Sequence, residues 1–125
     1  MARKALVADD DKDARFLWAV VAREFELEVV EASNGREALE LLAQDIEIGL
    51  VVLDVMMPLL TGYKVLHEMR SDDRLKAIPV IISTANRTTQ ALDEIVVDDR
   101  TSFVNKASGI DNMRRGIARA LGRPE

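Results

Sequence analysis

Short apolar runs alternate with longer helical patterns five times along these 125 residues. Each helical pattern is about ten residues or longer, enough to carry the chain back across a sheet so that the next strand runs parallel to the previous one. This alternation predicts a parallel sheet with helices packed on both faces. The expected strands are 4–9, 27–31, 49–54, 78–83 and 101–105, and the expected helices are 13–26, 34–44, 62–71, 87–97 and 109–121.

The residue types within the expected strands indicate their order in the sheet. The first, third and fourth strands are continuously apolar over 5–8, 50–53 and 80–82, as in strands covered on both faces. The second and fifth strands mix polar with apolar residues, which is typical of edge strands. With right-handed crossovers, these edges favour the order 2-1-3-4-5, which makes the first and third strands neighbours at the switch point.

Composition restricts the chemistry. The chain has no Cys and one His, His67, which excludes disulfides, Cys-ligated metals and His-rich metal sites. A net charge of -5 disfavours a protein that binds nucleic acid through its phosphates. The length fits one domain over residues 1–125, and no apolar run approaches the roughly 20 residues of a membrane span. We therefore expect a cytoplasmic domain that contacts neither nucleic acid nor membrane.

Carboxylates follow two of the strands that this order places side by side. Asp9, Asp10 and Asp11 end the first strand, and Asp54 ends the third. Ligands of doubly wound sheets bind at the carboxyl ends of the strands beside the switch point, so at least three of these acids are expected to converge. Two unit charges about 5 Å apart repel by roughly 3 kcal/mol at an effective dielectric constant of about 20, so the cluster needs protonation or a cation. Oxygen ligands without His or Cys suit Mg²⁺.

Two further strand ends should face the same crevice. The fourth strand finishes at the segment 83–85, where Thr84 offers a hydroxyl, and the fifth is followed by Lys106, which offers an ammonium group. A cation, a hydroxyl and a Lys around a carboxylate all stabilise negative charge on a phosphoryl group. Asp54 is then the expected nucleophile, attacking phosphorus to give an acyl phosphate.

These residues resemble the motifs of the receiver domains of two-component response regulators, including chemotaxis regulators. The resemblance extends from about Lys4 to Leu121, and its matching segments are 6–11, 52–58 with Gly62, 80–85 and 103–106. It implies a flavodoxin-like doubly wound (βα)5 fold with the strand order given above. It also implies a phosphoacceptor, Asp54, and a Mg²⁺ ion in an acidic pocket formed by Asp9, Asp10, Asp54 and the backbone carbonyl of Met56.

The same resemblance assigns roles beyond the acidic pocket. Thr84 is expected to bind a phosphoryl oxygen, Lys106 to pair with the phosphoryl group, and Thr84 and Phe103 to act as switch residues. A sensor histidine kinase or a histidine phosphotransfer protein is the implied donor, and a downstream protein is the implied target. The domain would catalyse only its own phosphorylation and dephosphorylation, as a monomer or weak dimer.

The sequence departs from the family pattern in three places. Ala107 stands where the family usually has a cis Pro after the Lys, and a non-proline cis bond costs about 2.5 to 4 kcal/mol, so a trans bond is expected. Asp98 and Asp99 replace a pair of small residues before the fifth strand. Phe103 stands at the aromatic switch position, often Tyr, and has no hydroxyl, so any gating there would act through packing alone.

Two other functions stay open. A phosphohydrolase with an aspartyl nucleophile generally carries a second Asp two residues later, and Met56 stands there. A receiver-shaped interaction domain that works without phosphorylation would be expected to lack pocket residues, whereas all five are present. These five are Asp9, Asp10, Asp54, Thr84 and Lys106.

Some side chains receive structural interpretations. Asn34 with Glu37, and Ser108 with Asp111, have the spacing of a capping box at a helix start. Phe16 and Trp18 widen the apolar surface of the first helix, and core packing is favoured over a partner-binding face. His67 is expected to be an exposed residue of the third helix.

Overall fold

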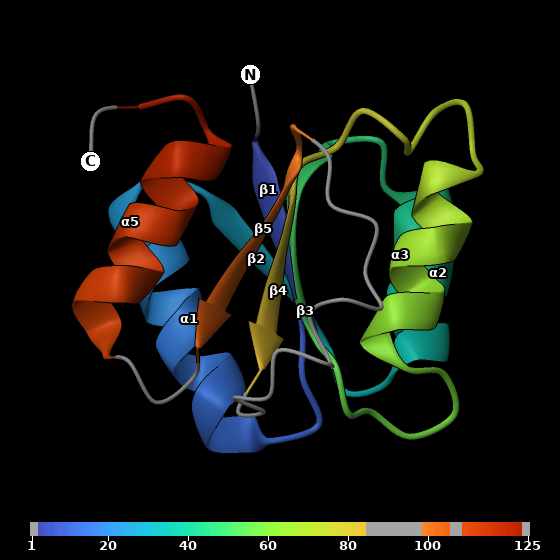
Figure 1. Cartoon of the computed structure of the whole chain (residues 1–125), viewed down its shortest axis with the longest axis horizontal. Helices are drawn as coiled ribbons and strands as arrows, with labels where there is room; N and C mark the ends of the chain where they lie inside the picture. Colours follow the sequence, from blue (N-terminus) through green and yellow to red (C-terminus); the bar gives the residue numbers. More distant parts are fainter. Residues whose placement is uncertain (1–2, 85–98, 106–108, 124–125) are drawn as a thin grey trace.

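The computed structural model describes residues 3–84, 99–105 and 109–123 of the chain. Within them, five parallel strands form one sheet in the order β2-β1-β3-β4-β5, which confirms the predicted topology. Helices α1 and α5 cover one face of the sheet, and α2 and α3 cover the other (Figure 1). The strands are β1 (Lys4–Ala8), β2 (Glu28–Ala32), β3 (Ile48–Asp54), β4 (Val80–Thr84) and β5 (Thr101–Asn105), and the helices are α1 (Lys12–Glu24), α2 (Gly35–Gln44), α3 (Gly62–Arg70) and α5 (Ile110–Ala120).

The predicted helix over 87–97 lies outside the described residues, as do Lys106, Ala107 and Ser108. Two other predicted boundaries need correction. Helix α1 ends at Glu24 rather than at residue 26, because Glu26 adopts a left-handed conformation with φ of 64° and reverses the chain into β2. Strand β4 begins at Val80 rather than at residue 78, since Pro79 has no N–H to donate to a sheet ladder.

Side chains alternate across the sheet and form two separate cores. Along β1, Leu6 and Ala8 belong to the core under α2 and α3, whereas Ala5 and Val7 belong to the core under α1 and α5. Trp18 of α1 is fully buried in the second core. Both faces of the central strands are therefore covered, as their continuously apolar sequences predicted.

The first helix does not bury all of its bulky residues. Trp18 is buried as predicted, but 62% of Phe16 and 45% of Leu17 are exposed. The prediction that Phe16 packs in the core is wrong, because Phe16 and Trp18 are two positions apart on a helix and so cannot both face the sheet. Phe16 and Leu17 instead form an exposed apolar patch on the first turns of α1.

The predicted helix starts have different outcomes. The Asn34 side chain accepts the Glu37 N–H at 2.8 Å, and the Glu37 carboxylate accepts the Ser33 N–H at 2.8 Å, so α2 begins with reciprocal capping. Ser108 lies outside the described residues, so the capping predicted for it stays a prediction; the described part of α5 begins after Gly109, whose φ of 98° favours glycine. His67 is exposed on α3, as predicted.

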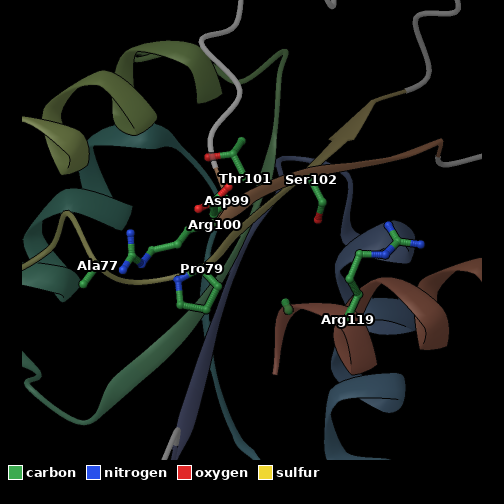
Figure 2. Close-up of a pocket in the computed structure, with 8 residues that line it drawn as sticks. Ala77, Pro79, Asp99, Arg100, Thr101, Ser102 and Arg119 are labelled. Atoms are coloured by element: carbon green, nitrogen blue, oxygen red, sulfur yellow. The ribbon is translucent and has the colours of Figure 1, made fainter. Parts of the chain in front are cut away.

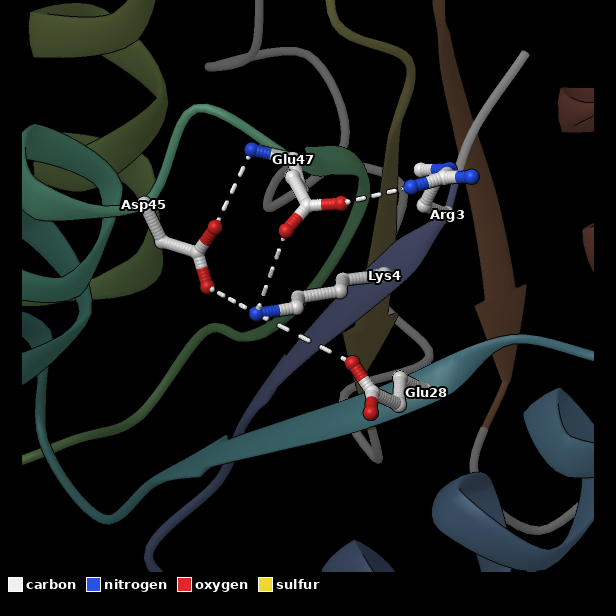
Figure 3. A network of polar contacts seen from close by, with 5 residues as sticks. All are labelled: Arg3, Lys4, Glu28, Asp45 and Glu47. Carbon is white, nitrogen blue, oxygen red and sulfur yellow. Dashed lines mark hydrogen bonds and ion pairs between the residues drawn. The ribbon is translucent and has the colours of Figure 1, made fainter.

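A network of charged side chains ties the amino ends of β1, β2 and β3 together (Figure 3). Lys4 Nζ lies 2.8 Å from Asp45 Oδ2 and 3.8 Å from one carboxylate oxygen of each of Glu28 and Glu47. The hydrogen bond with Lys4 lowers the pKa of Asp45, and the same bond raises the pKa of Lys4. Solvent still reaches 22% of the Lys4 side chain and 23% of Asp45, so water screens the pair substantially.

This network predicts a specific acid sensitivity. Because folding lowers the pKa of Asp45 below its ordinary value of 3.8, its stabilising contribution is present above that value and is lost as the pH falls through the folded-state pKa. We expect Asp45→Asn to have a lower melting temperature than wild type at neutral pH. This difference in melting temperature should shrink as the pH falls to about 2.5. Circular dichroism melts across this range measure the effect. Asp73→Asn, at an exposed ion pair with Lys76, is the control, and an unchanged difference for Asp45→Asn would contradict the prediction.

Candidate functional site

Three carboxylates converge at the carboxyl end of the sheet. Asp9, Asp10 and Asp54 each offer one carboxylate oxygen, and these oxygens all lie within 4.8 Å of one another. Asp9 and Asp54 are buried, at 1% and 5% exposure, whereas Asp10 is exposed to solvent. The convergence expected from the strand order is therefore present, and one side of the cluster is open to solvent.

The register of the two central strands produces this cluster. In the parallel pair β1 and β3, Ala8 lies opposite Leu53, so the residues that follow them emerge side by side. Asp9 comes directly after β1, and Asp54 is the last residue of β3. Both strands are apolar up to this point, which confines the polar side chains to the end of the sheet.

Local hydrogen bonds hold Asp9. Its Oδ1 accepts the backbone N–H of Asp11 at 2.8 Å, and its backbone carbonyl accepts a hydrogen bond from Arg15 Nη1 at 2.7 Å. Arg15 Nε also lies 2.9 Å from Glu31 Oε1, which ties α1 to β2. Asp11 is the N-cap of α1, where it accepts the Asp13 N–H at 3.0 Å. Asp9 and Asp10 thus belong to the acidic cluster, whereas Asp11 begins helix α1.

The segment after β3 passes close to the backbone of Asp54. The Gly62 N–H donates to the Val55 carbonyl at 3.0 Å, and a Cβ at Gly62 would lie 2.2 Å from the Asp54 carbonyl oxygen. Only glycine allows this approach. The Met56 side chain is 73% exposed, so it takes no part in the core, and only its backbone carbonyl is a candidate metal ligand.

The close approach at Gly62 predicts a large effect of a single methyl group. We expect Gly62→Ala to destabilise the fold by about 2 kcal/mol, because the backbone of Asp54 must move. Gly116→Ala in α5 is the matched control, since its Cβ would meet a methyl group of the Val104 side chain rather than backbone. Urea unfolding measures both variants, and equal destabilisation of the two would contradict the interpretation.

Strand β4 brings two hydroxyls to the same end of the sheet. Ser83 lies opposite Asp54 in the register of β3 and β4, and Thr84 follows it as the last residue of β4. Both residues are buried. The Ser83 hydroxyl accepts a hydrogen bond from the Trp18 indole N–H at 3.1 Å. Trp18 carries no sequence signal for this contact, because the two residues are 65 positions apart.

The remaining predicted site residues lie on or after β5. Phe103 is half-buried and packs against the core under α2 and α3, and Asn105 lies opposite Thr84 in the register of β4 and β5. Lys106 follows directly but lies outside the described residues, so its predicted role stays a prediction. Phe103 and Thr84 are on neighbouring strands, and their expected role as switch residues stays a prediction.

A pocket of about 350 Å³ lies at the opposite, amino-terminal end of β4 and β5 (Figure 2). Its lining shares no residue with the acidic cluster. The pocket is lined by Ala77, Pro79, Asp99, Arg100, Thr101, Ser102, Arg119 and Ala120.

The donor atoms of the acidic cluster fit a hard divalent cation. Oxygens bound to one Mg²⁺ at about 2.1 Å lie at most about 4.2 Å apart, so atoms within 4.8 Å need to close by only about half an ångström. Carboxylate oxygens without nitrogen or sulfur donors favour Mg²⁺ over zinc or copper. Asp9, Asp10 and Asp54 are therefore the side chains that could hold the ion.

Comparison with known proteins decides the family. The sequence model for the response regulator receiver domain matches residues 5–118. The chain belongs to the response regulator receiver domain family. Receiver domains are signalling domains of two-component systems, so this is also the general function of the chain. None of the described helices is both long and apolar enough to cross a membrane.

Named relatives agree with this assignment. The chain is 27% identical over 116 residues to the two-component response regulator ORR5 of Oryza sativa, covering 93% of this receiver domain and 87% of that protein. It is 32% identical over 118 residues to the regulatory protein AtoC of Escherichia coli, of which it spans 25%. Among solved structures, the chemotaxis response regulator CheY4 of Vibrio cholerae superposes with a TM-score of 0.84 at 25% identity, covering 97% of this chain and all of that one.

Proposed function

We propose that Asp54 is the phosphoacceptor of this receiver domain and that the domain signals by phosphorylation-dependent docking to another protein. The observation that carries the proposal is the convergence of Asp9, Asp10 and Asp54 at the end of the sheet. Within this cluster, one oxygen of Asp9 already accepts a backbone N–H, and Asp10 is exposed. Asp54 is buried at the end of β3 with its backbone held against Gly62, which suits a nucleophile that must keep a fixed position.

The proposed reaction transfers one phosphoryl group. A carboxylate oxygen of Asp54 attacks phosphorus and forms a new P–O bond, while the bond from phosphorus to the donor atom breaks and its electron pair leaves with the donor. The Thr84 hydroxyl would donate a hydrogen bond to a phosphoryl oxygen, and the Lys106 ammonium group would pair with the negative charge of the phosphoryl group. Mg²⁺ held by Asp9, Asp10, Asp54 and the Met56 carbonyl would neutralise charge on the phosphoryl oxygens.

The donor and the target are proposed to be proteins. A phosphohistidine of a sensor kinase or of a histidine phosphotransfer protein could approach Asp54 from the side on which Asp10 is exposed to solvent. The exposed patch of Phe16 and Leu17 lies on the first turns of α1, directly after the acidic residues, and could contribute apolar contacts to such a donor. Phe103 would respond to phosphorylation through its packing, since it carries no hydroxyl.

The phosphoacceptor can be identified by mass. Incubation with acetyl phosphate and Mg²⁺ is expected to add one phosphoryl group to the wild type, and none to Asp54→Asn, since the amide is a poor nucleophile. Intact-protein mass spectrometry with and without EDTA measures the adduct. Asp73→Asn, at an exposed acid distant in sequence from the cluster, should behave like wild type. An adduct that survives in Asp54→Asn, or an unmodified wild type with both acetyl phosphate and a histidine kinase, would overturn the proposal and favour an interaction domain that works without phosphorylation.

Mg²⁺ binding can be tested through stability. Because the three carboxylates repel one another, Asp10→Asn is expected to raise the melting temperature in EDTA by a few degrees and to abolish most of the rise that Mg²⁺ causes in wild type. Thermal melts at several Mg²⁺ concentrations measure both effects. An Asp10→Asn protein that Mg²⁺ stabilises as much as wild type would contradict the assignment of the ligands.

A further inference from the structure

A buried hydrogen bond connects α1 to the strand end beside Asp54. The Trp18 indole N–H donates to the Ser83 hydroxyl at 3.1 Å, and both residues are 0% exposed. A buried indole N–H needs an acceptor, and a buried hydroxyl needs a partner. Trp18 is the only tryptophan of the chain. The bond is therefore fully removed from water and carries a unique spectroscopic label.

The layer that contains Trp18 lies directly beneath the acidic cluster. Val7, Val52 and Ile81 belong to the same core cluster as Trp18. Asp54 and Ser83 come two residues further along β3 and β4, where side chains two apart share a face, and Asp9 follows the end of β1. The indole thus packs beneath the acidic cluster on the face covered by α1, and its N–H reaches Ser83 on β4.

The position of Ser83 makes this bond relevant to the site. Ser83 is the register partner of Asp54, so the ladder between β3 and β4 ends at these two residues. It is followed by Thr84, the hydroxyl proposed to bind the phosphoryl group. Since the side-chain bond ties Ser83 to α1, its loss would let the end of β4 shift relative to Asp54.

We propose that Trp18 is a positioning residue of the acidic site: by holding the Ser83 hydroxyl, it sets the end of β4, and with it Thr84, against Asp54. The inference deepens the proposed function and rests on it for the role of Thr84. Trp18 acts through Ser83 rather than by contact with a cation or a phosphoryl group. The indole thereby has a role beyond filling the core, because a core role would need only its volume.

Three variants separate positioning from packing. Trp18→Phe keeps an aromatic ring but removes the N–H donor, Ser83→Ala removes the acceptor, and the double variant removes both. Calorimetric titration with Mg²⁺ should show an affinity about three- to tenfold weaker in each single variant. Without the bond the free protein no longer holds the end of β4 in place beside Asp54, so binding must restore that position at a cost of about one net hydrogen bond. The double variant should be no weaker than the weaker single variant, because the bond can be lost only once.

The indole N–H signal gives a readout that a merely structural role would not change. The ¹H–¹⁵N spectrum should contain one indole cross-peak, which is expected to move when Mg²⁺ binds wild type and to move less in Ser83→Ala at saturating Mg²⁺. Ser71→Ala is the matched control, since it removes a hydroxyl that donates to the His67 carbonyl at the exposed end of α3. This control should keep wild-type Mg²⁺ affinity and the full shift.

The outcomes are distinct from those of the proposed function. The positioning role would be overturned if both single variants kept wild-type Mg²⁺ affinity, or if their losses of affinity added up in the double variant. It would also be overturned if the indole cross-peak did not move when Mg²⁺ binds. A lowered melting temperature with unchanged Mg²⁺ affinity would reduce Trp18 to a core residue, and so overturn it as well. The phosphoryl adduct on Asp54 is judged separately by mass, so either idea can fail while the other stands.

Discussion

Repulsion among three carboxylates at the end of two adjacent parallel strands is the constraint on which the rest of this receiver domain depends. Asp9, Asp10 and Asp54 lie close enough for their charges to destabilise the fold, so apolar packing elsewhere must offset this cost. Fully covered strands β1, β3 and β4 supply that packing through two separate cores. A divalent cation bound by these carboxylates would relieve the same repulsion.

Charges are arranged differently at the two ends of the sheet. At the amino end, Lys4 lies among Asp45, Glu28 and Glu47, and opposite charges balance. At the carboxyl end, like charges gather, and in the described part of the chain this is the one group of three acids close enough to share a metal ion. The amino-terminal charges thus stabilise the fold by pairing, whereas the fold itself holds the carboxyl-terminal charges together.

A paired charge also joins the helices on one face of the sheet. Arg114 of α5 binds both carboxylate oxygens of Glu24, at 2.7 and 3.1 Å, and thereby connects α5 to α1. The hydrogen bond with Arg114 lowers the pKa of Glu24. The helix that carries Trp18 is therefore anchored at its far end by an ion pair and near the acidic site by the bond to Ser83.

Sequence reasoning failed where a residue's surroundings, rather than its type, decide its role. Phe16 is as apolar as any core residue, yet it is exposed because the helix can turn only one stripe toward the sheet. Trp18 was expected only to fill the core. Its bond to Ser83 joins positions 65 apart and depends on the packing of α1 against β4.

The sequence by itself determined the alternation of strands and helices, the strand order and the set of acids at the strand ends, because hydrophobic periodicity and residue type are local properties. Only the tertiary structure decided how these parts meet. It set the 4.8 Å convergence of Asp9, Asp10 and Asp54, the approach of Gly62 to the Asp54 backbone, and the partner of the Trp18 indole. These are contacts between segments distant in sequence, and their geometry depends on register and helix docking, which no single segment encodes.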